Sequence, residues 1–238
     1  GDLSKEKRQD SHRLLPFKCD IKLPTKSFTE EIWLNLTYPL KHQLKSPAVV
    51  DFNDSSRIES VNVLRFDGFG WWSSNVDGSG FARVAEYFGI DIASGACLGI
   101  IGGGGAARST AHTWTTLGGS VKALGGKRDL NDYDWFEGAD PSERTCDVLV
   151  NFDDDSYPED ITVNGFCVKS QYHPIEGEYA DRVAAVKHKI VDGRWLLAAQ
   201  HLESWSQLWA PQCKDYLPSL DLIISKLIQA ETILASYA

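Results

Sequence analysis

A glycine-rich stretch in the middle of the chain has the spacing of a phosphate-binding turn. Residues 98–108 read LGIIGGGGAAR, and Gly102, Gly104 and Ala107 fit the pattern G-x-G-x-x-G/A. In such a turn the first glycine bends the chain, the second lets the backbone approach a pyrophosphate, and the small third residue lets helix and strand pack closely. A purely structural turn is the alternative, but we expect a dinucleotide cofactor here. Its expected contacts are Gly102, Gly103, Gly104, Gly105, Ala106 and Ala107.

The end of the next expected strand indicates which dinucleotide binds. A site for NAD usually carries an Asp or Glu there, which accepts a hydrogen bond from the ribose 2′-hydroxyl. Here residues 120–124 run into two glycines followed by Lys127 and Arg128. Two cations suit a 2′-phosphate, and the arginine offers it a planar fork of donors. We therefore predict NADP as the cofactor. Asp129, one residue further along, leaves NAD as an alternative, and a solvated basic loop that binds no cofactor is another.

The turn needs a strand before it and a helix after it, and the sequence pattern predicts both. Residues 96–101 are a continuous apolar run, which is typical of a strand buried on both faces. A helix-like stretch follows at 106–117 and a second strand at 120–124, so the whole segment predicts a βαβ unit. Further strands are expected at 146–151 and 165–168.

The remaining elements predict a second domain before residue 90. A short strand at 32–34, an alternating strand at 60–66 and a return strand at 71–72 are followed by a helix at 81–88. Asp67 and Gly68 form the turn signal of a hairpin between the last two strands. Helices dominate after residue 178, at 179–191, 194–209 and 217–237.

These elements predict an α/β protein of two domains. An N-terminal α/β substrate-binding domain is expected over residues 1–90, completed by the helices of 201–238, which pack back on it. A Rossmann-type NADP-binding domain is expected over 91–200, with the natural boundary near 89–95.

Composition and charge exclude several classes of function. The chain carries 24 basic and 33 acidic residues, so its net charge of −9 disfavours nucleic acids and anionic membranes. No apolar run reaches the roughly 18 residues of a membrane helix, and the polar N-terminus has no signal peptide, so we expect a soluble, cytoplasmic protein. Neither the five scattered cysteines nor the six histidines have metal-ligand spacing, and we expect reduced thiols and no metal.

Polar residues that could act on a substrate gather in the N-terminal part. Taken individually, each of these residues is more often an ordinary loop residue than a catalytic one. The set is Asn35, Thr37, Lys41, Asn62, Asn75 and Asp77.

Together with their neighbours, these residues resemble motifs of the shikimate dehydrogenase family. NLTYPLK at 35–41 resembles N-V-T-x-P-x-K, VNV at 61–63 resembles V-N-T, and NVDGSGF at 75–81 resembles N-T-D-G-x-G-F. GGGGAAR at 102–108 is similar to G-A-G-G-A-A-R, and GRWLLAAQ at 193–200 resembles G-x-x-M-L-x-x-Q. Five motifs in the family's order are far more specific than any one of them.

The resemblance implies an enzyme that reversibly reduces the ketone of 3-dehydroshikimate with NADPH. By position, Lys41 and Asp77 would be the catalytic dyad, because the alkoxide left by hydride transfer needs a proton donor and a positive charge beside it. Substrate-binding residues would be Thr37, Asn62, Tyr172 and Gln200, and Asn151 would contact the cofactor.

Two family segments are altered in this chain. No S-x-S-P segment, whose hydroxyls bind the substrate carboxylate, precedes Asn35, and the expected N-A-T-P-x-G reads NFDDD at 151–155. The resemblance implies a small polyhydroxy carboxylate as substrate, and these alterations leave its identity open, with quinate and an aminated analogue as alternatives.

Other interpretations also remain. The chain could be a domain of a multifunctional enzyme, or a non-catalytic NADP-binding regulatory module of the same fold. It could be a monomer or a homodimer.

Overall fold

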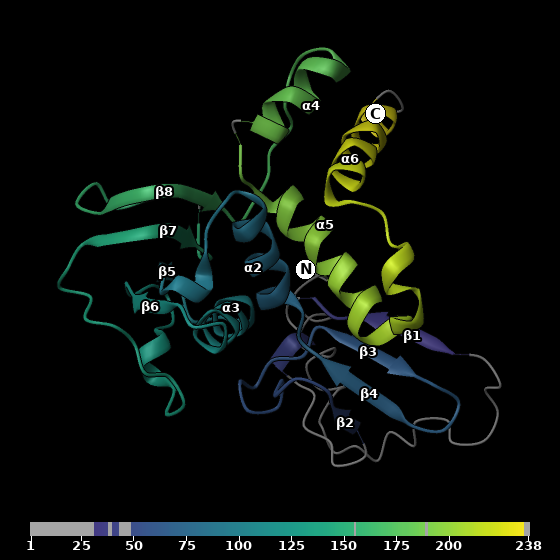
Figure 1. Cartoon of the computed structure of the whole chain (residues 1–238), viewed down its shortest axis with the longest axis horizontal. Coiled ribbons are helices and arrows are strands. Elements are labelled where there is room, and N and C mark those ends of the chain that lie inside the picture. The colour runs from purple at the N-terminus through teal and green to yellow at the C-terminus, as the bar shows by residue number, and fades with distance from the viewer. Residues whose placement is uncertain (1–30, 38–39, 43–48, 155, 189, 236–238) are drawn as a thin grey trace, which may run out of the picture. The chain divides into compact units, whose positions relative to one another are not determined.

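The computed structural model describes residues 31–37, 40–42, 49–154, 156–188 and 190–235 (Figure 1). Cys19, two positions of the 35–41 motif and Asp155 lie outside the described residues. The chain divides into two compact units, Gly1–Asn75 and Val76–Ala238. This division falls earlier than the boundary expected near 89–95, so the helix that follows Asn75 groups with the second unit. The predicted domains 1–90 and 91–200 stay a prediction.

The first unit is built on a four-stranded sheet in the order β1-β3-β4-β2. Its strands are β1 (Ile32–Asn35), β2 (Val49–Asp51), β3 (Val63–Phe66) and β4 (Trp71–Ser74). The predicted hairpin is confirmed, because β3 and β4 pair antiparallel around Asp67 and Gly68. The sequence pattern does not predict β2, which pairs parallel with β4.

One aspartate organises the hairpin turn. Asp67 Oδ1 accepts hydrogen bonds from the amides of Phe69 and Gly70, at 2.9 and 2.8 Å, and Oδ2 accepts from Trp72 Nε1 at 2.8 Å. These bonds hold the pKa of Asp67 below its ordinary value, the amide of Gly70 contributing most.

The small hydrophobic core of this unit contains Val61, Leu64, Phe66 and Trp71.

The second unit contains a parallel sheet in the order β6-β5-β7-β8. Its strands are β5 (Cys97–Ile101), β6 (Ser120–Ala123), β7 (Thr145–Asn151) and β8 (Thr162–Lys169). Leu98, Ile100, Val148 and Val150 are fully buried, as expected for strands covered on both faces. The chain moves from β5 to β6 on one side and then returns to β7 on the other. The carboxyl ends of β5 and β7 are therefore a topological switch point, where open α/β sheets bind ligands.

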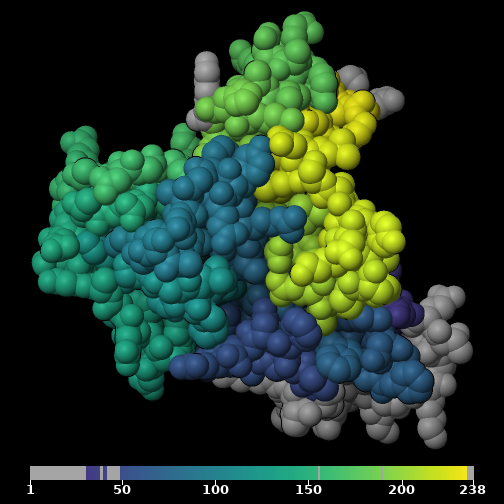
Figure 2. Space-filling model, viewed as in Figure 1, coloured from purple at the N-terminus to yellow at the C-terminus, as the bar shows by residue number. Residues whose placement is uncertain are grey.

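The helices of this unit are α2 (Asp77–Tyr87), α3 (Gly105–Thr116), α4 (Tyr179–His188), α5 (Gly193–Ser204) and α6 (Leu220–Ala235). α2 packs against both α3 and α5, and α6 packs against α4 and α5. In the space-filling view the yellow C-terminal segment meets the green surface of α4 (Figure 2). The mixed α/β fold with a parallel, Rossmann-like sheet is thus confirmed.

Several helix ends differ from the prediction. α2 begins at Asp77 rather than at 81, and the α-helix expected over 194–209 changes at Trp205–Trp209 into a wider π-type turn. The start of α5 is set by Asp192, whose side chain accepts a hydrogen bond from the amide of Arg194. Among the described residues, no helix is both long and apolar enough to cross a membrane.

Candidate functional site

The glycine turn leaves the sheet at the end of β5 and leads directly into α3. Gly102 has a φ of +105°, a conformation that favours glycine, and its amide donates to the carbonyl of Gly125 at 2.7 Å. Gly104 precedes the helix without a side-chain cap, and a Cβ built there would meet nothing within 4 Å. The first amides of α3 therefore border open space, which is the geometry of an anion-binding helix N-terminus.

An arginine and a tyrosine hold this turn from behind. Tyr133 Oη donates to the carbonyl of Gly103 at 3.1 Å. Arg108, which is buried in the second turn of α3, places Cζ 4.8 Å from the centroid of the Tyr133 ring. The arginine of the GGGGAAR segment therefore stabilises the turn through Tyr133.

The loop after β6 contacts the glycine turn. Gly126 has a φ of +131°, and a Cβ on it would lie 2.6 Å from the amide nitrogen of Gly102. Lys127 and Arg128 follow on the surface. Asp129, which kept NAD open as an alternative, accepts from the backbone and side-chain nitrogens of Asn131, both at 3.0 Å. Its carboxylate is therefore used to cap the short helix that follows.

A cavity of about 410 Å³ lies where these two loops meet the loop after β7. It is lined by residues at the carboxyl ends of three neighbouring parallel strands, at the switch point of the sheet. Its lining residues are Ile101, Leu124, Gly126, Lys127, Asn151, Asp153, Asp154, Ser156, Tyr157 and Pro158.

Asn151 organises the loop after β7. Its Oδ1 accepts from the amides of Asp153 and Asp154, at 2.9 and 3.2 Å, and its Nδ2 donates to Asp154 Oδ1 and to the carbonyl of Ser156. Hydrogen bonds from Ser156 lower the pKa of Asp154, with a smaller contribution from the charge of Lys127. These hydrogen bonds of Asn151 thus all stay within its own loop, and its contact with a cofactor stays a prediction.

In the first unit, one predicted catalytic residue and two predicted substrate-binding residues lie on adjacent segments. The amide of Leu36 donates to the carbonyl of Asn62 at 2.6 Å, and the amide of Val61 donates to the carbonyl of Lys41 at 2.8 Å. These bonds place Thr37, Lys41 and Asn62 together where β1 ends and β3 begins. Asn62 is buried, whereas Lys41 is half-buried.

Asn75 has a structural role that the sequence did not indicate. Its Nδ2 donates to the carbonyl and hydroxyl oxygens of Ser60, at 3.1 and 2.8 Å. Its backbone amide donates to Asn53 Oδ1, and its carbonyl accepts from Asn53 Nδ2. Asn75 therefore fixes the chain where β4 ends.

The next motif residues explain how α2 is positioned. Asp77 is buried as the first residue of α2, where a carboxylate interacts favourably with the helix dipole. The amide of Gly78 donates to Ser109 Oγ at 2.9 Å, and a Cβ on this glycine would lie 2.2 Å from the carbonyl of Ser109. A Cβ on Gly80 would lie 2.8 Å from the amide nitrogen of Gln200. Both glycines therefore permit close helix contacts, the first with α3 and the second with α5.

Comparison with known proteins supports the resemblance seen in the motifs. No family model matches the chain. The shikimate dehydrogenase (NADP(+)) of Halobacterium salinarum is 26% identical over 203 residues, covering 75% of this chain and 74% of the relative. That of Aeropyrum pernix is 27% identical over 192 residues, covering 71% and 70%. The crystal structure of shikimate 5-dehydrogenase from Thermus thermophilus, in complex with NADP(H) and shikimate, matches with a TM-score of 0.61 at 21% identity, over 89% of this chain and 82% of that one.

The chain is similar to NADP-dependent shikimate dehydrogenases. Lys41 lies in the first unit and Asp77 begins α2 in the second, and their action as a dyad stays a prediction. The roles carried over to Tyr172 and Gln200 stay predictions as well.

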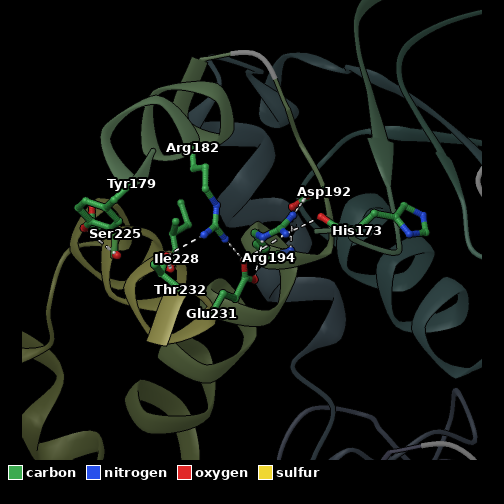
Figure 3. A network of polar contacts seen from close by, with 9 residues as sticks. All are labelled: His173, Tyr179, Arg182, Asp192, Arg194, Ser225, Ile228, Glu231 and Thr232. Carbon is green, nitrogen blue, oxygen red and sulfur yellow. Dashed lines mark hydrogen bonds and ion pairs between the residues drawn. The ribbon is translucent and has the colours of Figure 1, made fainter. Parts of the chain in front are cut away.

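Near Tyr172 the structure shows a buried arginine that the shikimate dehydrogenase-like motifs did not single out. Arg194 is 1% exposed, and its Cζ lies 4.9 Å from the centroid of the Tyr172 ring. It pairs with Asp192 at 2.6 Å and Glu231 at 2.9 Å, and its Nη2 donates to the carbonyl of His173 at 2.7 Å (Figure 3). Arg194 therefore joins the segment that carries Tyr172 to α5 and α6.

The charges of this network balance one another. Burial raises the pKa of Asp192 and opposes the charge of Arg194, but the hydrogen bond with Glu231 and the charge of Asp192 keep the pKa of Arg194 above its ordinary value. Arg182, which lies on α4, adds a second cationic contact to Glu231 at an N–O distance of 3.2 Å. The sequence contained a signal for the contact between Asp192 and Arg194, since an aspartate two residues before the second residue of a helix has the spacing of an N-cap.

Proposed function

We propose that this protein is an NADP-dependent oxidoreductase that reversibly reduces 3-dehydroshikimate, or a close cyclohexene or cyclohexane carboxylate, to the corresponding alcohol. The observation that carries the proposal is the uncapped N-terminus of α3 behind the glycine turn, beside a cavity at the switch point of the parallel sheet. The NADP-dependent shikimate dehydrogenases to which the chain is similar supply the substrate class.

The residues around the turn fit a dinucleotide phosphate. Gly104 leaves the space before α3 open, and Gly102 adopts a backbone conformation that lets the chain bend away from β5. The first amides of α3 would hold the pyrophosphate, and Lys127 and Arg128 are the cations for the 2′-phosphate. When bound, the cofactor supplies the hydride.

The chain's own residues would then handle the proton. As the substrate ketone accepts the hydride, the ammonium group of Lys41 donates a proton to the developing alkoxide, and in the oxidation direction the neutral amine takes it back. Asp77 would keep the lysine charged and oriented. The hydroxyl of Thr37 and the amides of Asn62 and Gln200 would hold the substrate hydroxyls, because each can form hydrogen bonds to an alcohol.

A non-catalytic module is the second candidate, and the loop after β7 favours it. The carboxylates of Asp153 and Asp154 line the cavity, where the family motif has no acidic residue. A protein of this kind would bind NADPH without turning over a substrate.

One assay separates the two candidates. We would follow the absorbance of NADPH during oxidation of shikimate and of quinate by NADP⁺, with wild type and Lys41→Ala. Loss of a general acid–base group lowers kcat by about 10²- to 10⁴-fold, while NADPH binding should be retained. The matched control is Lys226→Ala, a lysine on α6 whose ammonium group donates to Gln229 of the same helix.

The outcomes are distinct. Turnover that is lost in Lys41→Ala and retained in Lys226→Ala supports the enzyme. Wild type that binds NADPH but turns over none of these substrates supports the module instead, and equal turnover in both variants removes Lys41 from the mechanism.

A further inference from the structure

The carboxylate of Asp153 lies in the crevice between the glycine turn and the end of β6. Its Oδ2 accepts a hydrogen bond from the amide of Lys127 at 2.5 Å. The same oxygen would lie 2.6 Å from a Cβ built on Gly126, and Oδ1 would lie 3.2 Å from one built on Gly102. Asp153 therefore occupies space that both glycines leave open.

Contacts on either side of Asp153 hold it in this position. The amide of Phe152 donates to the carbonyl of Ile101 at 2.9 Å, which extends the pairing of β5 with β7 past the strand end. The Phe152 ring lies 6.3 Å from that of Phe81 in the core. With the amide of Asp153 bound by Asn151, the side chain points into the crevice rather than along the surface.

This position opposes an anionic ligand in two ways. Asp153 uses the backbone amide of Lys127, a donor that a phosphate could otherwise accept from. Its charge also borders the cavity together with that of Asp154, so a phosphate brought there meets like charges. Lys127 and Arg128 offset these charges from the exposed side of the loop.

We propose that Asp153 competes internally with the phosphate groups of the nucleotide and thereby lowers the affinity of this chain for NADPH more than for NADH. This inference rests on the proposed function. NADPH is affected more because its 2′-phosphate adds about −1.5 to −2 charges that NADH lacks, as for other phosphate monoesters near neutral pH. Asp153 is in this sense a residue that sets cofactor selectivity.

The test is direct measurement of NADPH and NADH binding by fluorescence titration, with wild type and Asp153→Asn. Asparagine retains an oxygen that can accept from Lys127, so the loop contact is preserved while the charge is removed. We expect NADPH to bind on the order of three- to tenfold more tightly in the variant, with a smaller gain for NADH and a smaller difference at high salt. Asp153→Ala, which removes both charge and hydrogen bond, should also bind NADPH more tightly.

Glu159→Gln is the matched control, since it makes the same charge change on an exposed residue of the same connection that does not line the cavity. It should leave the NADPH dissociation constant unchanged. An unchanged or weaker NADPH affinity in Asp153→Asn overturns the inference, as does an equal gain in Glu159→Gln.

The two proposals fail in different ways. If wild type oxidises shikimate with NADP⁺ while Asp153→Asn binds NADPH no more tightly, only the role of Asp153 is wrong. If neither wild type nor Asp153→Asn binds NADPH, the proposed function and the role of Asp153 both fail.

Discussion

Gly80 of α2 and Gln200 of α5 lie so close together that a Cβ on the glycine would be 2.8 Å from the amide nitrogen of Gln200. Each belongs to a different motif, and the two motifs are far apart in the sequence. The contact explains why a glycine is needed at this position of a helix, where it is otherwise unfavourable. It also couples the position of Gln200 to α2, the helix that begins with Asp77.

We therefore predict that Gly80→Ala destabilises the protein. The added methyl group meets backbone atoms that cannot move independently, and overpacking of this kind destabilises by about 1 to 3 kcal/mol. This loss exceeds the stabilisation of roughly 1 kcal/mol that alanine gives as the better helix former. Urea unfolding measures the difference. Gly70→Ala is the control, because a Cβ there meets no atom within 4 Å. Equal stability of Gly80→Ala and wild type would contradict the packing argument.

Arg194→Met should be among the most destabilising substitutions in the second unit. It leaves Asp192, which is 4% exposed, and Glu231 without their main cationic partner, and breaking a buried ion pair in this way costs about 3 to 5 kcal/mol. The control is Arg144→Met, which breaks an exposed pair with Asp160 and should cost about 1 kcal/mol or less. Urea midpoints at neutral pH compare the two, and similar losses would show that the buried network has no special role.

His201 should make the stability of the protein depend on pH. Burial lowers its pKa below the ordinary value of 6.5, with its ring 6.2 Å from that of Trp209. Between the lowered and the ordinary pKa the unfolded chain binds more protons than the folded one, so this contribution to stability is lost as the pH falls below 6.5. We expect the difference in melting temperature between pH 7.5 and pH 5.5 to shrink in His201→Gln. An unchanged difference in His201→Gln would contradict this role of the buried imidazole.

Removing the two cations after β6 should weaken NADPH binding selectively. Charged hydrogen bonds to a phosphate contribute enough that the double variant Lys127→Ala/Arg128→Ala should bind NADPH roughly 10- to 100-fold more weakly. NADH, which lacks the 2′-phosphate, should be affected much less. Dissociation constants for both cofactors, with Lys226→Ala as the control, measure this. An equal loss of affinity for NADH would mean that these two cations attract the cofactor only through their general positive charge and do not bind the 2′-phosphate.

Much of the second unit could be predicted because its pattern is local. The apolar run of β5, the glycines after it and the helical spacing of α3 determine one another over neighbouring residues, and their order is confirmed. β2 could not be predicted, because its three residues form a strand only by pairing with β4, which follows later in the chain. The π-type turn at Trp205–Trp209 likewise has no signal in the helical periodicity.

The sequence by itself determined the fold class, the glycine turn between β5 and α3 and the order of the motifs, because these follow from residue types and short-range spacing. Only the tertiary structure decided which distant side chains meet. Gly80 contacts Gln200, Arg194 connects the Tyr172 segment to α6, and Asp153 bonds to Lys127 across 26 residues of sequence. Each of these contacts depends on how strands and helices pack, since side chains from different elements come within reach only when the whole unit has folded.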